Sequence, residues 1–268
     1  MLTQVLRATP RSLFLASAFF FATSYFALRF PDAPGADAGS YVSTLLIALP
    51  PFVTLFRYLG ARRAALSLLA LSAFAYAIES VGVATGLPYG PFYYGDALGG
   101  RLLGLVPYLL PLSYAPLAIG AVAASWNDGS ERNHRLLLVL RAALLLTLID
   151  GVLDPGAARM GFWVWPDGGA YYGVPLSNYA GWLLSGALAA ILLLATGGWR
   201  TAPLPGLLDG AVLALAFWTG VAVFSGLVVP ALLGAALLAY LLHSRSRLRS
   251  LEDGAGREMG INWAGRKR

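Results

Sequence analysis

Residues 207–243 read LLDGAVLALAFWTGVAVFSGLVVPALLGAALLAYLLH, with one acidic side chain and no lysine or arginine. A membrane-spanning helix needs about 20 largely apolar residues. The stretch is too long for one span and long enough for two. Gly226 and Pro230 near its middle are typical of a turn. We therefore predict two spans here, at 207–224 and 227–243.

The rest of the chain contains further apolar runs of spanning length. They lie at 12–28, 40–56, 64–85, 102–125, 136–152 and 176–195. The whole chain is 58% hydrophobic and 12% charged, whereas a globular chain has about 25% charged residues. So few charges could not cover a soluble surface. We predict an all-α, polytopic membrane bundle of about eight transmembrane helices, with one domain over 1–243 and a basic cytoplasmic tail over 244–268.

The basic residues test this count, because short cytoplasmic loops collect Lys and Arg. With eight spans and the N-terminus inside, only Arg29, Arg101 and Arg159 of the 19 basic residues lie on the outer side. Seven spans would put the basic tail outside. We expect a multi-pass protein of the cell (inner) membrane with both termini cytoplasmic. The alternative of a cleaved signal peptide at 12–28 fits less well, because this run is long for one.

The net charge of +6 is explained by a basic tail on anionic lipid, so the lipid bilayer is an expected partner and nucleic acid is not. The chain has no cysteine and two histidines, which excludes thiolate metal sites and multi-histidine iron sites. Its one lysine, Lys267, is near the C-terminus, which excludes a retinal Schiff base inside the bundle. We expect no metal and no cofactor, and chemistry carried by carboxylates and aromatic rings.

Two predicted outer segments are unusually aromatic. Residues 86–95 read GLPYGPFYYG, residues 161–165 read GFWVW and residues 171–175 read YYGVP. An aromatic belt at the membrane interface is one explanation. Segments that fold back into the protein as the wall of a binding site are the other, and we favour it because the inner side has no similar density. The candidate substrate-binding aromatics are Tyr89, Tyr93, Tyr94, Trp163, Trp165, Tyr171 and Tyr172.

Both segments follow a span with a carboxylate near its outer end. Glu79 precedes the first, and Asp150 and Asp154 precede the second. Carboxylates inside a membrane are costly and indicate function by default, although acids that only join helices remain the alternative. Pro155 disfavours a helical Asp154; if the helix continues, Asp154 shares a face with Asp150. Asn178 lies at the same predicted depth and is a further substrate-binding candidate.

Carboxyl groups in an apolar pocket can remain protonated at neutral pH. Such a group can donate a proton to a weakly basic partner, even an alkene. Aromatic faces stabilise a cation that forms beside them. An acid inside an aromatic cage is therefore suited to protonating a carbon–carbon double bond.

These motifs together resemble the carotenoid-biosynthesis membrane family that contains the carotenoid 1′,2′-hydratases of the γ-carotene and bisanhydrobacterioruberin types. The resemblance covers about 76–182 and rests on Glu79, TGLPYG at 85–90, Tyr93-Tyr94, Val106-Pro107, Asp150, Asp154-Pro155, GFW at 161–163, YYGVP at 171–175, Asn178 and Gly181-Trp182.

The resemblance implies cofactor-free addition of water to the terminal double bond of an acyclic ψ-end group, in a γ-carotene-like or lycopene-like carotenoid. The carotenoid is then the substrate, and other enzymes of the pathway are candidate partners. A proton-coupled transporter and a lycopene-cyclase-like enzyme remain alternatives.

We expect Glu79, Asp150 and Asp154 to be catalytic and to reach one cavity near the outer face. One carboxyl, Asp150 or Asp154 ahead of Glu79, would protonate C2′ of the substrate, and a second would take a proton from the added water.

Overall fold

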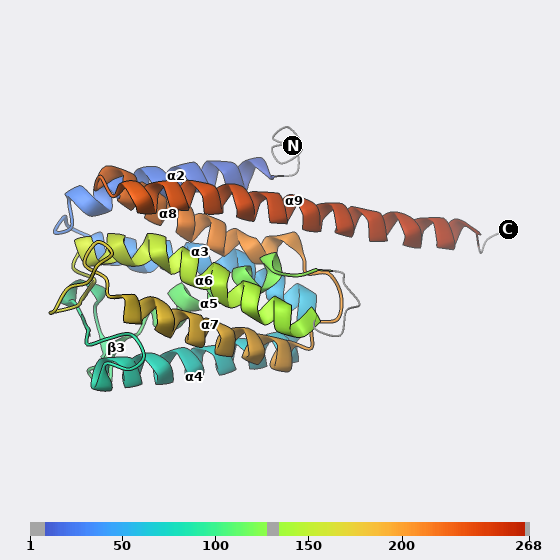
Figure 1. Ribbon diagram of the computed structural model, residues 1–268. Helices are drawn as coiled ribbons and strands as arrows, with labels where there is room; N and C mark the ends of the chain where they lie inside the picture. The colour runs from blue at the N-terminus through green and yellow to red at the C-terminus, as the bar shows by residue number, and fades with distance from the viewer. Residues whose placement is uncertain (1–8, 128–133, 266–268) are drawn as a thin grey trace.

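The computed structural model describes residues 9–127 and 134–265 and forms an elongated helical bundle (Figure 1). Residues 266–268 of the predicted basic tail lie outside the described part. The helices are α2 (Arg11–Arg29), α3 (Ala36–Leu59), α4 (Ala61–Thr85), α5 (Leu110–Ala124), α6 (His134–Arg159), α7 (Leu176–Gly197), α8 (Asp209–Phe224) and α9 (Val228–Gly265), with 3-10 turns η1 (Asp96–Leu98) and η2 (Pro205–Leu208). The predicted fold class is confirmed.

Within the described residues, seven helices are long and apolar enough to cross a membrane. The exception is α5, whose 15 residues span about 22 Å, short of the ~30 Å hydrocarbon core. The expectation of a full span at 102–125 is therefore wrong: its first part forms a loop with strands β2 (Arg101–Leu102) and β3 (Val106–Pro107).

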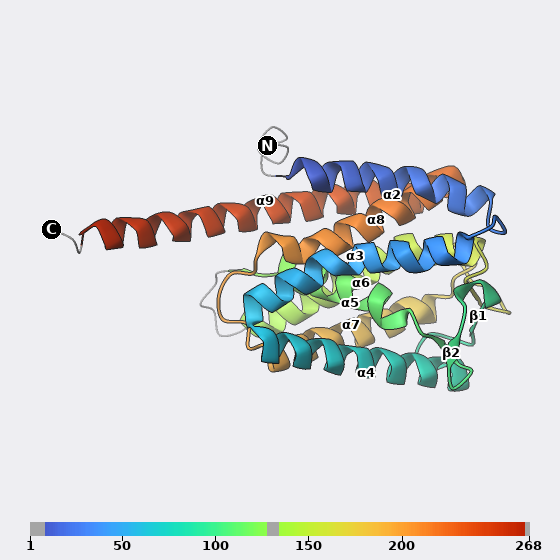
Figure 2. The ribbon, with the colours of Figure 1, turned by 180° about the vertical axis from the view of Figure 1, so that it is seen from behind.

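Helix α5 is the centre of the bundle. Every residue from Tyr114 to Ala124 is buried, and the helix packs against α3, α4, α6, α7 and α8. A helix that is apolar all round is a core helix, which is how Figures 1 and 2 show it. Its sequence is as apolar as that of a spanning helix because the helix is surrounded by protein. The helix is nevertheless too short to cross a membrane.

The predicted division of 207–243 is confirmed. Helix α8 ends at Phe224 and α9 begins at Val228. Between them Gly226 has φ +72°, a left-handed conformation that glycine adopts without strain.

Helix α6 continues through Pro155 to Arg159, so of the two alternatives for Asp154 the continued helix is the one that forms. A proline inside a helix removes one backbone hydrogen bond. Here every residue from Ile149 to Ala157 is buried, and packing on all sides outweighs that loss. Asp154 consequently lies one turn after Asp150 on the same face.

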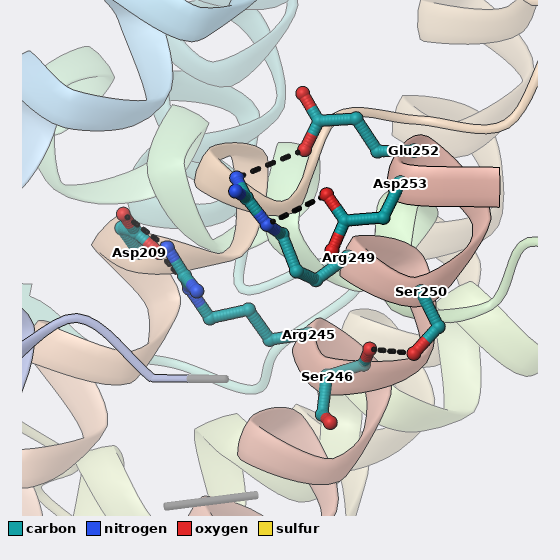
Figure 3. A network of polar contacts seen from close by, with 7 residues as sticks. All are labelled: Asp209, Arg245, Ser246, Arg249, Ser250, Glu252 and Asp253. Carbon is teal, nitrogen blue, oxygen red and sulfur yellow. Dashed lines mark hydrogen bonds and ion pairs between the residues drawn. The ribbon is translucent and has the colours of Figure 1, made fainter. Parts of the chain in front are cut away.

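Helix α9 does not end at residue 243, where the sequence placed the domain boundary. It runs to Gly265 and extends beyond the bundle (Figure 1). Packing continues past the boundary, because Arg245 and Leu248 are buried. Arg245 Nε donates to Asp209 Oδ1 at 2.7 Å and thereby joins α9 to the start of α8 (Figure 3).

The two aromatic segments meet at one end of the bundle. Strand β1 (Tyr93–Tyr94) pairs antiparallel with β4 (Trp163–Val164), and β2 pairs with β3. We call this end, which carries residues 86–109 and 160–175, the aromatic end. The opposite end, where Asp209 and Arg245 lie, is the basic end. Both ends of the described chain lie toward the basic end (Figures 1 and 2).

Candidate functional site

Three helices bring the predicted carboxyl groups together near the aromatic end. Helix α4 contributes Glu79, α6 contributes Asp150 and Asp154, and α7 contributes Asn178. Helix α7 packs against both α4 and α6. The exposed fraction is 6% for Glu79 and 2% for each of the other three. These polar side chains are therefore inside the protein and not at its lipid-facing surface.

Asn178 joins the two aspartates. Its Nδ2 donates to Asp150 Oδ2 at 3.0 Å and also contacts Asp154 Oδ2. Because one nitrogen contacts an oxygen of each acid, the two carboxyl groups lie side by side. One amide nitrogen, with two protons to donate, thus holds both acids in a fixed arrangement.

The two aspartates differ in their remaining oxygens. Asp154 Oδ1 accepts a hydrogen bond from Trp163 Nε1 at 3.0 Å, so both oxygens of Asp154 face N–H donors. Asp150 Oδ1 is buried and has no hydrogen-bond partner within the described residues. Buried polar atoms are nearly always paired, so the unpaired oxygen of Asp150 marks the position where a proton or a ligand atom fits.

Glu79 is bound by a tyrosine. Tyr94 donates its hydroxyl to Glu79 Oε2 at 2.9 Å. Burial raises the pKa of Tyr94 well above its ordinary value, and the negative charge of Glu79 raises it further. The phenol therefore remains protonated and acts as a donor. Glu79 is also close enough to Asp154 and Asp150 for their charges to interact, so the three acids form one cluster.

The pairing of β1 with β4 places two donors on this cluster. Tyr94 is directly opposite Trp163 in the antiparallel register, and residues opposite each other point to the same face of a sheet. Their ring centroids are 6.1 Å apart. Alternation along the strand turns Tyr93 to the other face, where it is 51% exposed, whereas Tyr94 is 6% exposed.

Tyr89 is held in a slot between two helices. A Cβ at Gly82 of α4 would lie 2.8 Å from Tyr89 Cδ2, and one at Gly181 of α7 would lie 2.6 Å from Tyr89 Cδ1. Only glycine allows this close approach of both helices to the ring. Tyr89 packs edge-on against Phe92 with centroids 6.1 Å apart. Phe92 in turn packs against Tyr94, with centroids 5.5 Å apart, so these rings form one continuous aromatic layer.

The predicted site residues thus fall into three groups. Those brought together by hydrogen bonds are Glu79, Asp150, Asp154, Asn178, Tyr94 and Trp163. Those in the adjoining buried aromatic layer are Tyr89 and Trp165. Those away from the carboxyl groups are Tyr93, Tyr171 and Tyr172.

The members of the last group have other contacts. Tyr172 is 40% exposed, and its hydroxyl accepts from Val229 N at 3.3 Å. Tyr171 packs against Tyr179, with ring centroids 5.7 Å apart. The two Tyr-Tyr-Gly motifs therefore occupy unlike positions, because only the first pairs with the other aromatic segment.

Sequence analysis did not identify two tyrosines near the cluster. Tyr114 of α5 lies close to Glu79 and Asp150, and Tyr179 of α7 lies close to Asp150 and Asp154. The hydroxyl groups of both are buried without a hydrogen-bond partner in the described chain. Each is a tyrosine inside an otherwise apolar helix, which is the signal that could have identified them. Tyr179 also follows directly after Asn178.

Metal binding has little support in the described residues. They include no group of three or more His, Cys, Asp or Glu side chains arranged to hold a metal ion. The cluster instead presents carboxyl oxygens to the N–H and O–H groups of Asn178, Trp163 and Tyr94. The arrangement thus places carboxyl groups, hydrogen-bond donors and aromatic rings side by side in one buried cluster.

Comparison with known proteins places this site in context. Residues 39–241 match the family model described as "Carotenoid biosynthesis protein". The chain is 42% identical over 210 residues to a protein of Haloarcula japonica named bisanhydrobacterioruberin hydratase, an alignment that covers 73% of this chain and 69% of the relative. No solved structure matches the chain significantly. All the residues of the carboxyl cluster lie inside the matched range.

Proposed function

Because this chain belongs to the carotenoid biosynthesis protein family, we propose that it is a carotenoid hydratase that adds water to the terminal C1′=C2′ double bond of an acyclic end group. A hydratase name on a relative of 42% identity supports the reaction type. The seven candidate spans of the described chain suit a substrate that is dissolved in the bilayer. The single observation that carries the proposal is the buried Asp150–Asn178–Asp154 cluster beside aromatic rings.

Hydration of an isolated alkene requires three things. A proton must be added to C2′, the tertiary cation that forms at C1′ must be stabilised, and water must then attack that cation. A buried carboxyl group can supply the proton. The rings of Tyr94 and Trp163, which lie beside the acids, can stabilise the cation by cation–π contact, worth about 2 kcal/mol in a desolvated site.

The hydrogen bonds support different roles for the two aspartates in this proposal. Asp154 receives N–H donors on both oxygens, and such donors favour the ionised form of a carboxyl group. Asp150 has a free oxygen, Oδ1, which can carry the proton and present it to C2′. Asp150 is therefore the acid, and Asp154 is the neighbouring carboxylate.

The protons balance in this scheme. Asp150 gives its proton to C2′, and the oxygen of water bonds to C1′. One proton of that water returns to the Asp150–Asp154 pair, whose carboxyl groups share the Asn178 amide. Glu79, fixed by the Tyr94 hydroxyl, is an acceptor that can orient the water. The net change is one water added, and no other reagent is consumed.

The distribution of acids also favours an enzyme over a proton-coupled carrier. A carrier needs polar groups through its whole depth. Glu79, Asp150 and Asp154 all lie toward the aromatic end, while the central helix α5 is buried and apolar from Ala115 to Ala124. The arrangement suits a site that is open to one side of the membrane.

The test is expression in a host that accumulates lycopene or γ-carotene, followed by mass analysis of the extracted pigments. We expect the wild-type chain to give a product heavier by one water. Asp150→Asn should lower hydration about 100-fold or more, and Asp154→Asn and Glu79→Gln should also be impaired. Asp167→Asn is the matched control, because Asp167 is an exposed acid of the same end.

Two results would contradict the proposal. A product of unchanged mass with an altered chromatographic position would indicate cyclisation. Wild-type hydration in all three cluster variants, at matched expression, would show that these acids are structural.

A further inference from the structure

A cavity lies at the basic end, apart from the carboxyl cluster. It has a volume of about 370 Å³ and lies between the C-terminal end of α5, the first turns of α6 and the middle of α9. Its lining includes Ser125, Asn127, Arg141, Tyr240, His243 and Arg247. Arg141 precedes Asp150 by nine residues on α6, about 13 Å along the helix. The proposed hydration chemistry uses none of these residues.

The cavity has a basic rim. Arg141, His243 and Arg247 are exposed, and the described lining contains no acidic side chain. Arg247 is held in place because its Nη2 donates to Trp126 O at 2.6 Å. A guanidinium group has five N–H donors in a fixed plane, so this anchored side chain can still bind an anion.

The lining of the cavity includes a serine whose hydroxyl group is buried and unpaired. Ser125 is 4% exposed, and its Oγ has no hydrogen-bond partner among the residues that the structure describes. A buried polar group without a partner is costly. If the Ser125 side chain turns toward the cavity, a ligand oxygen there would provide the missing hydrogen bond, and the negative charge of the ligand would be attracted by the two arginines.

We propose that this cavity binds a phosphate group, held by the exposed guanidinium groups of Arg141 and Arg247 and completed by a hydrogen bond from the Ser125 hydroxyl. Arginine is suited to phosphate because its N–H groups can make paired bonds to two oxygens. The phosphate belongs to an anionic phospholipid headgroup or to a soluble phosphate ester. The half-exposed ring of Tyr240 beside the cavity is typical of a headgroup site at a membrane interface.

The experiment uses the full-length protein in nanodiscs of mixed phosphatidylglycerol and phosphatidylcholine. Native mass spectrometry then measures how many lipids of each kind remain bound. We expect the wild type to retain phosphatidylglycerol selectively. Arg141→Gln/Arg247→Gln should lower that affinity about thirtyfold.

Two further variants separate loss of the site from misfolding. Ser125→Ala keeps every charge and should lower the affinity about tenfold. Arg141→Gln alone alters one exposed side chain, which should leave the fold intact. The matched control is Arg62→Gln/Arg249→Gln, which removes the same charge from α4 and α9 outside the cavity. Arg249 pairs with Glu252 and Asp253 (Figure 3).

Competition with soluble glycerol 1-phosphate distinguishes the two sources of phosphate. If this compound displaces the lipid at millimolar concentration, the site binds soluble phosphate esters; if it does not, the site is specific for the lipid. Equal retention of phosphatidylglycerol by the cavity variants and by the Arg62→Gln/Arg249→Gln control would overturn the proposal.

Discussion

Replacing Asn178 by leucine tests whether the two aspartates depend on their shared amide. Leucine has a similar size but no donor, so Asp150 Oδ2 and Asp154 Oδ2 would both lose the N–H that now contacts them. All three side chains are 2% exposed, so water cannot replace the lost donor. The change therefore removes two hydrogen bonds and leaves their acceptors buried.

The magnitude follows from the state of each acceptor. A hydrogen bond to an ionised group contributes about 1.5–3 kcal/mol to the free energy of unfolding, and one to a neutral group about 1 kcal/mol. With one carboxylate and one protonated carboxyl, the expected loss is about 2.5–4 kcal/mol. In chains of comparable size this corresponds to a melting temperature lower by about 5–15 °C.

The same change should impair hydration, because the acid and its neighbour lose their fixed arrangement. A loss of about 1.4 kcal/mol in transition-state stabilisation lowers the rate tenfold, and we expect at least that. The assays are thermal unfolding in detergent and pigment analysis at matched expression. Ser177→Ala is the control on the same turn, since Ser177 is exposed and its Oγ contacts Tyr89 O only at 3.5 Å.

One outcome would refute this reasoning. If Asn178→Leu unfolds at the same temperature as Ser177→Ala and hydrates the carotenoid at the same rate, the amide does not hold the aspartates together. If only hydration is lost, the amide positions the acids but contributes little to stability.

Trp163→Phe keeps a ring but removes the N–H bound to Asp154, so we expect the free energy of unfolding to fall by about 1.5–3 kcal/mol. The control Trp199→Phe removes a buried N–H without a partner in the described chain and should be less destabilising. Equal melting temperatures of the two variants would contradict this prediction. Gly181→Ala would put a Cβ 2.6 Å from the ring of Tyr89 and should lower the free energy of unfolding by about 1–3 kcal/mol. Thermal unfolding measures this change, and an unchanged midpoint would show that the ring can move. A reporter fused after residue 250 should be cytoplasmic, because both ends of the described chain lie toward the basic end even though α5 is too short to span (Figures 1 and 2), and basic residues collect on the cytoplasmic side; a periplasmic signal would refute the predicted orientation.

Several features of the site could be predicted from the sequence because they depend on composition and local order. Glu79, Asp150 and Asp154 stand out in apolar runs, where carboxylates are rare. The spacing of those runs puts all three acids near one end of the bundle, and the structure agrees. Asn178 was predicted from depth alone, but its role as the bridge between two acids was not.

Other features depended on which segments pair. Tyr93 and Tyr94 are adjacent and chemically identical, so no local pattern separates them. Pairing of β1 with β4, segments about 70 residues apart, turns Tyr94 toward Glu79 and Tyr93 outward. Likewise, the second Tyr-Tyr pair, at Tyr171 and Tyr172, resembles the first in sequence but lies elsewhere.

The sequence by itself determined that this is a helical membrane bundle with acids at its aromatic end, because hydropathy and charge are summed along the chain. Only the tertiary structure decided that α5 is a short core helix and that α6 continues through Pro155. In both cases burial by neighbouring helices outweighs the local preference. The same packing decides which donor reaches which carboxyl, because a hydrogen bond depends on positions in space that distant segments define together.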